Sequence, residues 1–202
     1  IKERLVAQET SSYDGVLVTV CKGHPEFQGK TLTEIAKMLD CDCVEAALRV
    51  IELGRGSASA CYFTMNESDV ERVMAYPRSM ICTDSSVARN NSVYHPRLRA
   101  SFPRAIGEYC RERGVLPLTE MIRKITSQPA HVYGLEGKGI IREGYDADIC
   151  IFDFDKIIDK ATYAEPTNRC EGLDYVIISG EIACAHAVYT GAGSGKAIRR
   201  KN

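Results

Sequence analysis

The pattern over residues 57–84 constrains the fold more than any other stretch. Residues 57–64, SASACYFT, and residues 79–83, SMICT, are short apolar segments typical of strands. Between them, NESDVERVMAY has the N-terminal Asn and the acidic first turn of a helix. Strand, helix and strand in this order form the crossover that joins parallel neighbours. We therefore expect an α/β fold with a parallel sheet.

The residues before this unit predict one more strand and two helices. GVLVTVC is β-branched and apolar and predicts a buried strand near 16–20. GKTLTEIAKML and CVEAALRVIEL predict two helices within residues 30–54, and Thr31 and Glu34 have the spacing of a capping box in the first. We interpret these helices as a segment inserted into the parallel fold.

The pattern changes towards the C-terminus. FPRAIGEYCRERG and LTEMIRKITSQPA predict helices, whereas residues 85–101 have no period and are expected to form a long loop. From residue 139 onward, short apolar segments alternate with glycine turns and no long helix intervenes. We place a domain boundary between residues 1–137 and a β-rich part, residues 138–202.

Composition excludes several classes of partner. The 202 residues are 45% apolar and 26% charged, which is typical of a soluble globular protein, and a net charge of −1 offers no basic surface for nucleic acid or anionic membranes. No apolar run is long enough to cross a bilayer. The nine cysteines are scattered, often within apolar runs, which predicts reduced, buried thiols in a cytoplasmic protein. The first residue is Ile, so we expect the chain to have been cut from a longer one.

Asp84 follows the predicted strand SMICT directly. An Asp at the end of a strand commonly accepts a hydrogen bond from a nearby backbone N–H, and this role needs no function. Shortly after it, YHPRLRASFPR brings His95, Arg97, Arg99 and Arg104 together in sequence. Guanidinium groups bind carboxylates through paired hydrogen bonds, but a solvated basic loop has the same composition. The residues alone leave both interpretations open.

Five segments taken together resemble a known family. They are the strand that ends in TD, the HPR…FPR loop, the helix LTEMIRKITSQPA, the strand GYDADICIFD and the ending YVIISGEIA…YTG. In this order they resemble the C-terminal part of the N-acyl-D-amino-acid deacylases (D-aminoacylases) of the amidohydrolase superfamily. The ADICIFD strand is common to many amidohydrolases, whereas the HPR…FPR loop and the YTG ending are more specific. The resemblance covers nearly the whole chain.

The resemblance implies a fold and a set of roles. The fold is the C-terminal fragment of a (β/α)8 TIM-type barrel with part of a small β-sandwich domain. Active sites of such barrels lie at the C-terminal ends of the strands, which puts Asp84 in the position of the family's catalytic aspartate and weak zinc ligand. Arg97 would bind the α-carboxylate of an N-acyl-D-amino acid substrate, with His95 and Ser85 also in the substrate site. Where the family has GSDG, this chain has CTDS, so its substrate preference is expected to differ.

The family's other metal ligands do not occur in this chain. The full-length enzyme would bind zinc, and the fragment alone is expected to bind none and to be inactive. Its exposed barrel edge would contact either the missing N-terminal part of the barrel or a second copy of the chain. Two alternatives remain: a cyclic-amide hydrolase of the dihydroorotase or hydantoinase kind, and a non-catalytic assembly module.

Overall fold

The computed structural model describes residues 13–85 and 95–198, which form a mixed α/β fold. The chain divides into two compact units, the first ending at Asn66 and the second beginning at Glu67. Within the described ranges, no helix is both long enough and apolar enough to cross a membrane.

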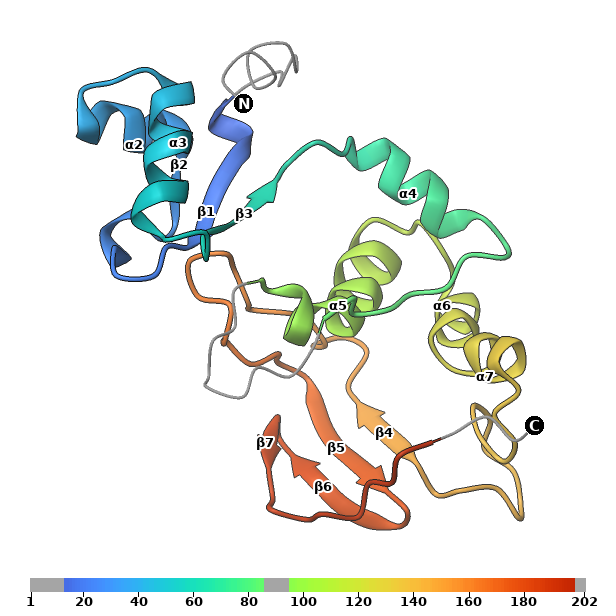
Figure 1. The fold of residues 1–202 in the computed structure, drawn as a ribbon. Coiled ribbons are helices and arrows are strands. Elements are labelled where there is room, and N and C mark those ends of the chain that lie inside the picture. The colour runs from blue at the N-terminus through green and yellow to red at the C-terminus, as the bar shows by residue number, and fades with distance from the viewer. Residues whose placement is uncertain (1–12, 86–94, 199–202) are drawn as a thin grey trace. The chain divides into compact units, whose positions relative to one another are not determined.

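The first unit is a three-stranded sheet with two helices packed against it (Figure 1). Its strands are β1 (Val16–Val20), β2 (Lys30–Thr31) and β3 (Ser59–Tyr62), in the order β2-β1-β3. The helices are α2 (Leu32–Leu39) and α3 (Cys43–Leu53), and short 3-10 helices cover Tyr13–Gly15 and Pro25–Phe27.

Buried and partly exposed side chains alternate along β1, and the buried ones form part of the core of this unit. Val16 and Val18 are buried, whereas Leu17 between them is partly exposed. The buried valines pack against one face of α2, where Ile35 is fully buried. The predicted capping box of α2 is confirmed, since Thr31 and Glu34 each accept a hydrogen bond from the other's backbone N–H.

The strand pairing corrects our prediction of a parallel sheet. β1 and β3 are direct neighbours and run antiparallel, with Val16 opposite Tyr62, and every other ladder in the described residues is antiparallel as well. Residues 79–83, predicted to be a strand, form none. An apolar, β-branched run identifies an extended segment, but it carries no information about which neighbour the segment pairs with or in which direction.

The second unit combines a group of helices with a four-stranded sheet (Figure 1). Its helices are α4 (Glu67–Ala75), α5 (Arg97–Arg104), the π-helix η3 (Ala105–Glu112), α6 (Leu118–Ile125) and α7 (Ser127–Tyr133). The strands are β4 (Ile149–Phe152), β5 (Leu173–Ile178), β6 (Glu181–Ala185) and β7 (Val188–Tyr189), in sequential order. These strands all lie within the segment expected to be β-rich. The boundary at 137/138 stays a prediction.

The helices of the second unit pack on the chain that connects β4 to β5. Met121 and Ile157 belong to one buried cluster with residues of η3. Gly107 of η3 allows the approach, because a Cβ atom there would lie 2.3 Å from the carbonyl oxygen of Ile157. Arg111 adds two hydrogen bonds of 2.8 Å, to the carbonyl oxygens of Phe154 and Ile157.

Candidate functional site

A buried lysine fixes the chain five residues before Asp84. Lys124 of α6 is 0% exposed. Its ammonium donates to the carbonyl oxygens of Tyr76 and Ser79, the latter at 3.1 Å, and lies 3.2 Å from the Ser79 hydroxyl oxygen. Burial lowers the pKa of Lys124, because it disfavours the charged form. A buried ammonium needs such acceptors, so this contact determines the path of the chain at residues 76–79.

Two further side chains from α6 and α7 bind the same turn. Arg123 Nη2 and Gln128 Nε2 donate to the carbonyl oxygen of Pro77 at 3.0 and 3.2 Å. The backbone N–H of Ile81 then points to the carbonyl oxygen of Lys124, 3.5 Å away. Residues 79–85 therefore leave this turn as a segment outside any helix or strand, anchored at its start.

Asp84 lies near the end of that segment. Its φ angle is +43°, in the left-handed region that non-glycine residues seldom adopt and that Asp tolerates better than most. The Asp84 side chain is 78% exposed, and Ser85 after it is exposed as well. Such a conformation at an exposed carboxylate is found more often at functional sites than elsewhere.

Arg97 begins a helix where a loop was expected. α5 starts at Arg97 and continues directly into η3, so the predicted loop of residues 85–101 extends at most to Pro96. Residues 86–94 of that predicted loop lie outside the described residues. The prediction failed because two prolines flank and interrupt this stretch. Pro96 precedes the first helical residue, where its lack of an N–H is harmless, and Pro103 is accommodated within the helix.

The structure brings Asp84 and Arg97 together. Arg97 Nη1 lies 2.9 Å from Asp84 Oδ2, and the two side chains are 44% and 78% exposed. Ion pairs between exposed side chains contribute about 0–1 kcal/mol, so either group can exchange its partner for a ligand. A guanidinium carries five N–H donors, so Arg97 can bind Asp84 and a second anion at the same time.

His95 lies beside this pair but contacts other groups. Its Nδ1 accepts a hydrogen bond from the backbone N–H of Arg97 at 3.1 Å, and its Nε2 lies 3.4 Å from the hydroxyl oxygen of Tyr163. The two rings meet edge to face with centroids 5.0 Å apart. Burial, followed by the positive charge of Arg97, lowers the pKa of His95 and favours the neutral ring.

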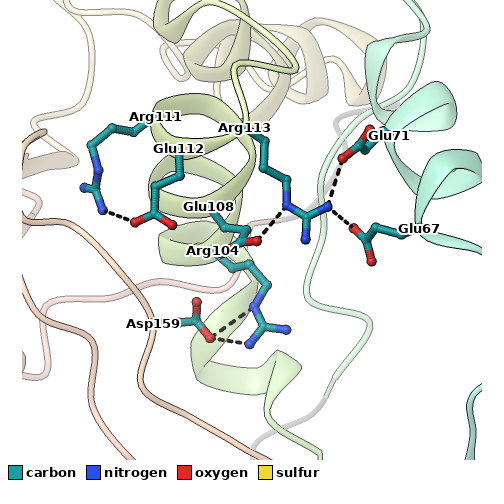
Figure 2. Close-up of polar contacts among 8 residues, drawn as sticks. All are labelled: Glu67, Glu71, Arg104, Glu108, Arg111, Glu112, Arg113 and Asp159. Carbon is teal, nitrogen blue, oxygen red and sulfur yellow. Dashed lines mark hydrogen bonds and ion pairs between the residues drawn. The ribbon is translucent and has the colours of Figure 1, made fainter.

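A network of ion pairs surrounds Arg113 at the C-terminal end of η3, the helix that continues α5 (Figure 2). Arg113 lies 3.3, 2.9 and 2.7 Å from carboxylate oxygens of Glu67, Glu71 and Glu108, and so links α4 to η3. Its guanidinium also lies 5.3 Å from the ring centroid of Tyr109. Burial and the neighbouring Glu67 carboxylate raise the pKa of Tyr109 to about 12.

The described residues provide no metal centre. They contain no group of three or more His, Cys, Asp or Glu side chains that could hold an ion. The nine cysteines all lie in the described residues and form no disulfide, but only Cys21 and Cys110 are buried, which corrects the prediction of buried thiols. The residues that the structure describes therefore do not fit a zinc site by themselves, since zinc requires three or four protein ligands.

Sequence reasoning missed two residues of this region. Lys124 lies on the apolar face of α6, three residues after the fully buried Met121. A lysine at that spacing within an amphipathic helix was the available signal. Tyr163 is 68 residues from His95 and lies in a polar loop, so no local pattern connects the two.

Comparison with known proteins gives consistent matches. The model of the amidohydrolase family matches residues 78–184. The N-acyl-D-glutamate deacylase of Alcaligenes xylosoxydans xylosoxydans is 36% identical over 176 residues, which are 87% of this chain and 35% of that protein. A crystal structure of D-aminoacylase superposes with a TM-score of 0.81 at 34% identity, over 92% of this chain and 38% of that one.

A second solved structure includes a metal and an inhibitor. The N-acyl-D-glutamate deacylase of Bordetella bronchiseptica, complexed with zinc and a phosphonate mimic of the tetrahedral intermediate, superposes with a TM-score of 0.78 at 33% identity. The match covers 94% of this chain and 38% of that one. This chain thus spans little more than a third of the length of the proteins it matches. Because the family model covers more than half of its residues, the chain belongs to the amidohydrolase family.

Proposed function

We propose that this chain forms the C-terminal part of a metal-dependent hydrolase that cleaves the amide bond of N-acyl-D-amino acids. The observation that carries the proposal is the distance of 2.9 Å between Asp84 and Arg97. In an α-amino acid, one carbon atom separates the carboxylate from the amide nitrogen. A substrate whose carboxylate binds to Arg97 therefore has its scissile nitrogen within reach of the Asp84 carboxylate.

Asp84 has the chemistry of a general base and acid in this arrangement. Its carboxylate takes a proton from the attacking water as the C–O bond to the acyl carbon forms. The same proton then passes to the amide nitrogen as the C–N bond breaks, which releases the D-amino acid and a carboxylate. The weak, exposed ion pair with Arg97 leaves Asp84 free to accept and return this proton.

Arg97 is the proposed carboxylate receptor. A guanidinium binds a carboxylate through two parallel hydrogen bonds, and this geometry fixes the orientation of the rest of the substrate. Ser85, which directly follows Asp84 and is exposed, remains a predicted contact to the substrate. His95 is also a predicted part of this site.

We propose zinc as the metal of the complete protein. The support is the zinc-bound deacylase structure that this chain resembles. Because the described residues contain no metal-binding group, the principal ligands would come from residues outside the described part of the chain.

The complete fold would place residues 79–83 as the last strand of a (β/α)8 barrel, with Asp84 at its C-terminal end. That strand needs neighbours, since residues 79–83 form no ladder with any other described residue. Apolar side chains of both units are exposed and would be covered by the remaining barrel or by a second copy of the chain; they include Tyr62, Met65, Val73 and Tyr76.

Hydrolysis assays test the proposed function. The complete protein with zinc should release D-amino acids from their N-acetyl derivatives and leave the L-enantiomers intact. Turnover of hydantoins or dihydroorotate alone would identify a cyclic-amide hydrolase instead. If no amide is cleaved while the protein binds zinc and is folded, the assembly-module alternative would replace this proposal.

A further inference from the structure

His95 has protein partners on both of its ring nitrogens. Nδ1 accepts from the backbone N–H of Arg97 at 3.1 Å, and Nε2 lies 3.4 Å from the Tyr163 hydroxyl. A nitrogen that accepts from an N–H carries no proton, so the proton of the neutral ring is on Nε2. The geometry thus assigns one tautomer, in which Nε2–H points to Tyr163.

The Nδ1 contact lies at the start of α5. The first N–H groups of a helix have no acceptor within the helix, and Pro96 at the N-cap has no side-chain group to supply one. His95 provides the acceptor for the N–H of Arg97. The imidazole therefore fixes the first turn of α5, from which the Arg97 side chain extends to Asp84.

The same helix is attached to residues 159–167 at two further positions. Arg99 Nη1 donates to the carbonyl oxygen of Thr167 at 2.6 Å. Arg104 donates from Nε and Nη2 to one oxygen of Asp159, at 3.1 and 2.6 Å, and the Asp159 side chain is only 6% exposed (Figure 2). The contact between His95 and Tyr163 is the attachment nearest to Arg97.

We propose that His95 and Tyr163 are positioning residues that set the direction of the Arg97 guanidinium towards the substrate carboxylate. His95 would act through the backbone of Arg97, and Tyr163 would hold the plane of the imidazole. The role in substrate recognition rests on the proposed function of Arg97. The capping of α5 by His95 stands independently of it.

Substitutions at residue 95 distinguish the roles of the two ring nitrogens. In His95→Ala both contacts are lost. In His95→Asn the side-chain oxygen can take the place of Nδ1 and accept from the Arg97 N–H, as Asn does at helix starts. Tyr163→Phe removes the hydroxyl and keeps the ring. The matched control is His131→Ala, which truncates an exposed histidine of α7.

The main readout compares two substrates in the complete, zinc-loaded protein. For N-acetyl-D-amino acids, His95→Ala should lower kcat/KM about tenfold, mainly through KM, because Arg97 loses its orientation. The corresponding C-terminal carboxamides lack the charge that Arg97 binds and should change much less. His95→Asn should restore most of the loss, and Tyr163→Phe should lower kcat/KM about threefold. Equal losses on both substrates, or no rescue by Asn, would overturn the proposal.

A second readout is independent of catalysis. Hydrogen exchange of the Arg97 amide should be faster in His95→Ala than in the parent or His131→Ala, and close to the parent rate in His95→Asn. If the parent protein hydrolyses no N-acyl-D-amino acid but this exchange pattern is found, the proposed function fails and the capping stands. Unchanged exchange in His95→Ala would overturn the positioning role in either case.

Discussion

The guanidinium of Arg97 and the carboxylate of Asp84 lie 2.9 Å apart, although 13 positions separate them in the sequence. Asp84 lies in a segment outside any helix or strand, and Arg97 begins a helix. A guanidinium can bind an anion, and a carboxylate can accept and return a proton. Because both side chains are exposed, their interaction is weak, and either group can exchange its partner.

Asp84→Asn should abolish turnover while the protein remains folded. Asn has nearly the same shape but cannot accept a proton, and losing one general acid–base group costs on the order of 10²–10⁴-fold in kcat. Steady-state hydrolysis of N-acetyl-D-amino acids measures the effect, with the exposed Asp155→Asn as the control. Activity within about threefold of the parent would show that Asp84 has the ordinary role of an Asp at a strand end.

Arg97→Ala should distinguish substrates by their charge. Removing the guanidinium eliminates the paired hydrogen bonds to the α-carboxylate, so KM for N-acyl-D-amino acids should rise by about tenfold or more. The carboxamide analogues should be affected little, and Arg97→Lys should recover only part of the loss because an ammonium is a point charge. An equal effect on both kinds of substrate would make Arg97 structural.

The 202-residue chain by itself should bind no zinc tightly and show no hydrolase activity. Zinc needs three or four convergent ligands, and the described residues offer no such group. Calorimetric titration with zinc and analytical ultracentrifugation test this, and the chain should self-associate or bind a separate N-terminal piece. A monodisperse monomer with tightly bound zinc and catalytic turnover would contradict the prediction.

Lys124→Met should destabilise the second unit. Met fills a similar volume, but it removes the buried donor to the carbonyl oxygen of Ser79 and one of the donors to that of Tyr76, which also accepts from Ser79. The loss of such bonds costs about 1–3 kcal/mol, only partly offset by removing a desolvated charge. Urea unfolding of the complete protein measures the change, and Lys196→Met at an exposed position should shift the midpoint little. An equal effect of both variants would show that the buried contacts of Lys124 do not contribute to the free energy of unfolding.

Tyr109 should remain protonated to high pH. Its folded-state pKa of about 12 lies above the usual value near 10. The folded state therefore holds the proton more tightly, so the stability contributed by this group is complete below pH 10 and is lost as the pH rises towards 12. Denaturant unfolding across this range should show a smaller decline with pH for Tyr109→Phe. A parallel decline in both proteins would exclude this linkage.

Several local features could be predicted from the sequence because they depend on near neighbours. The capping box of Thr31 and Glu34 needs only residues three apart, and the amphipathic face of α6 needs only a period of 3.6 residues. The position of Asp84 directly after an apolar segment was visible for the same reason. The helix at Arg97 was missed because its prolines are ordinary signals for a loop.

The sequence by itself indicated most helical segments and the β-rich C-terminal part, which follow from local patterns, whereas Asp84 and Arg97 became candidates through the resemblance to a family. Only the tertiary structure decided that β1 and β3 pair antiparallel, that Lys124 is buried under the turn before Asp84, and that Tyr163 contacts His95. Each of these contacts joins residues more than 35 positions apart. The free energy of such contacts depends on which surfaces meet when the chain packs, and hydrophobic periodicity within a short window does not encode that choice.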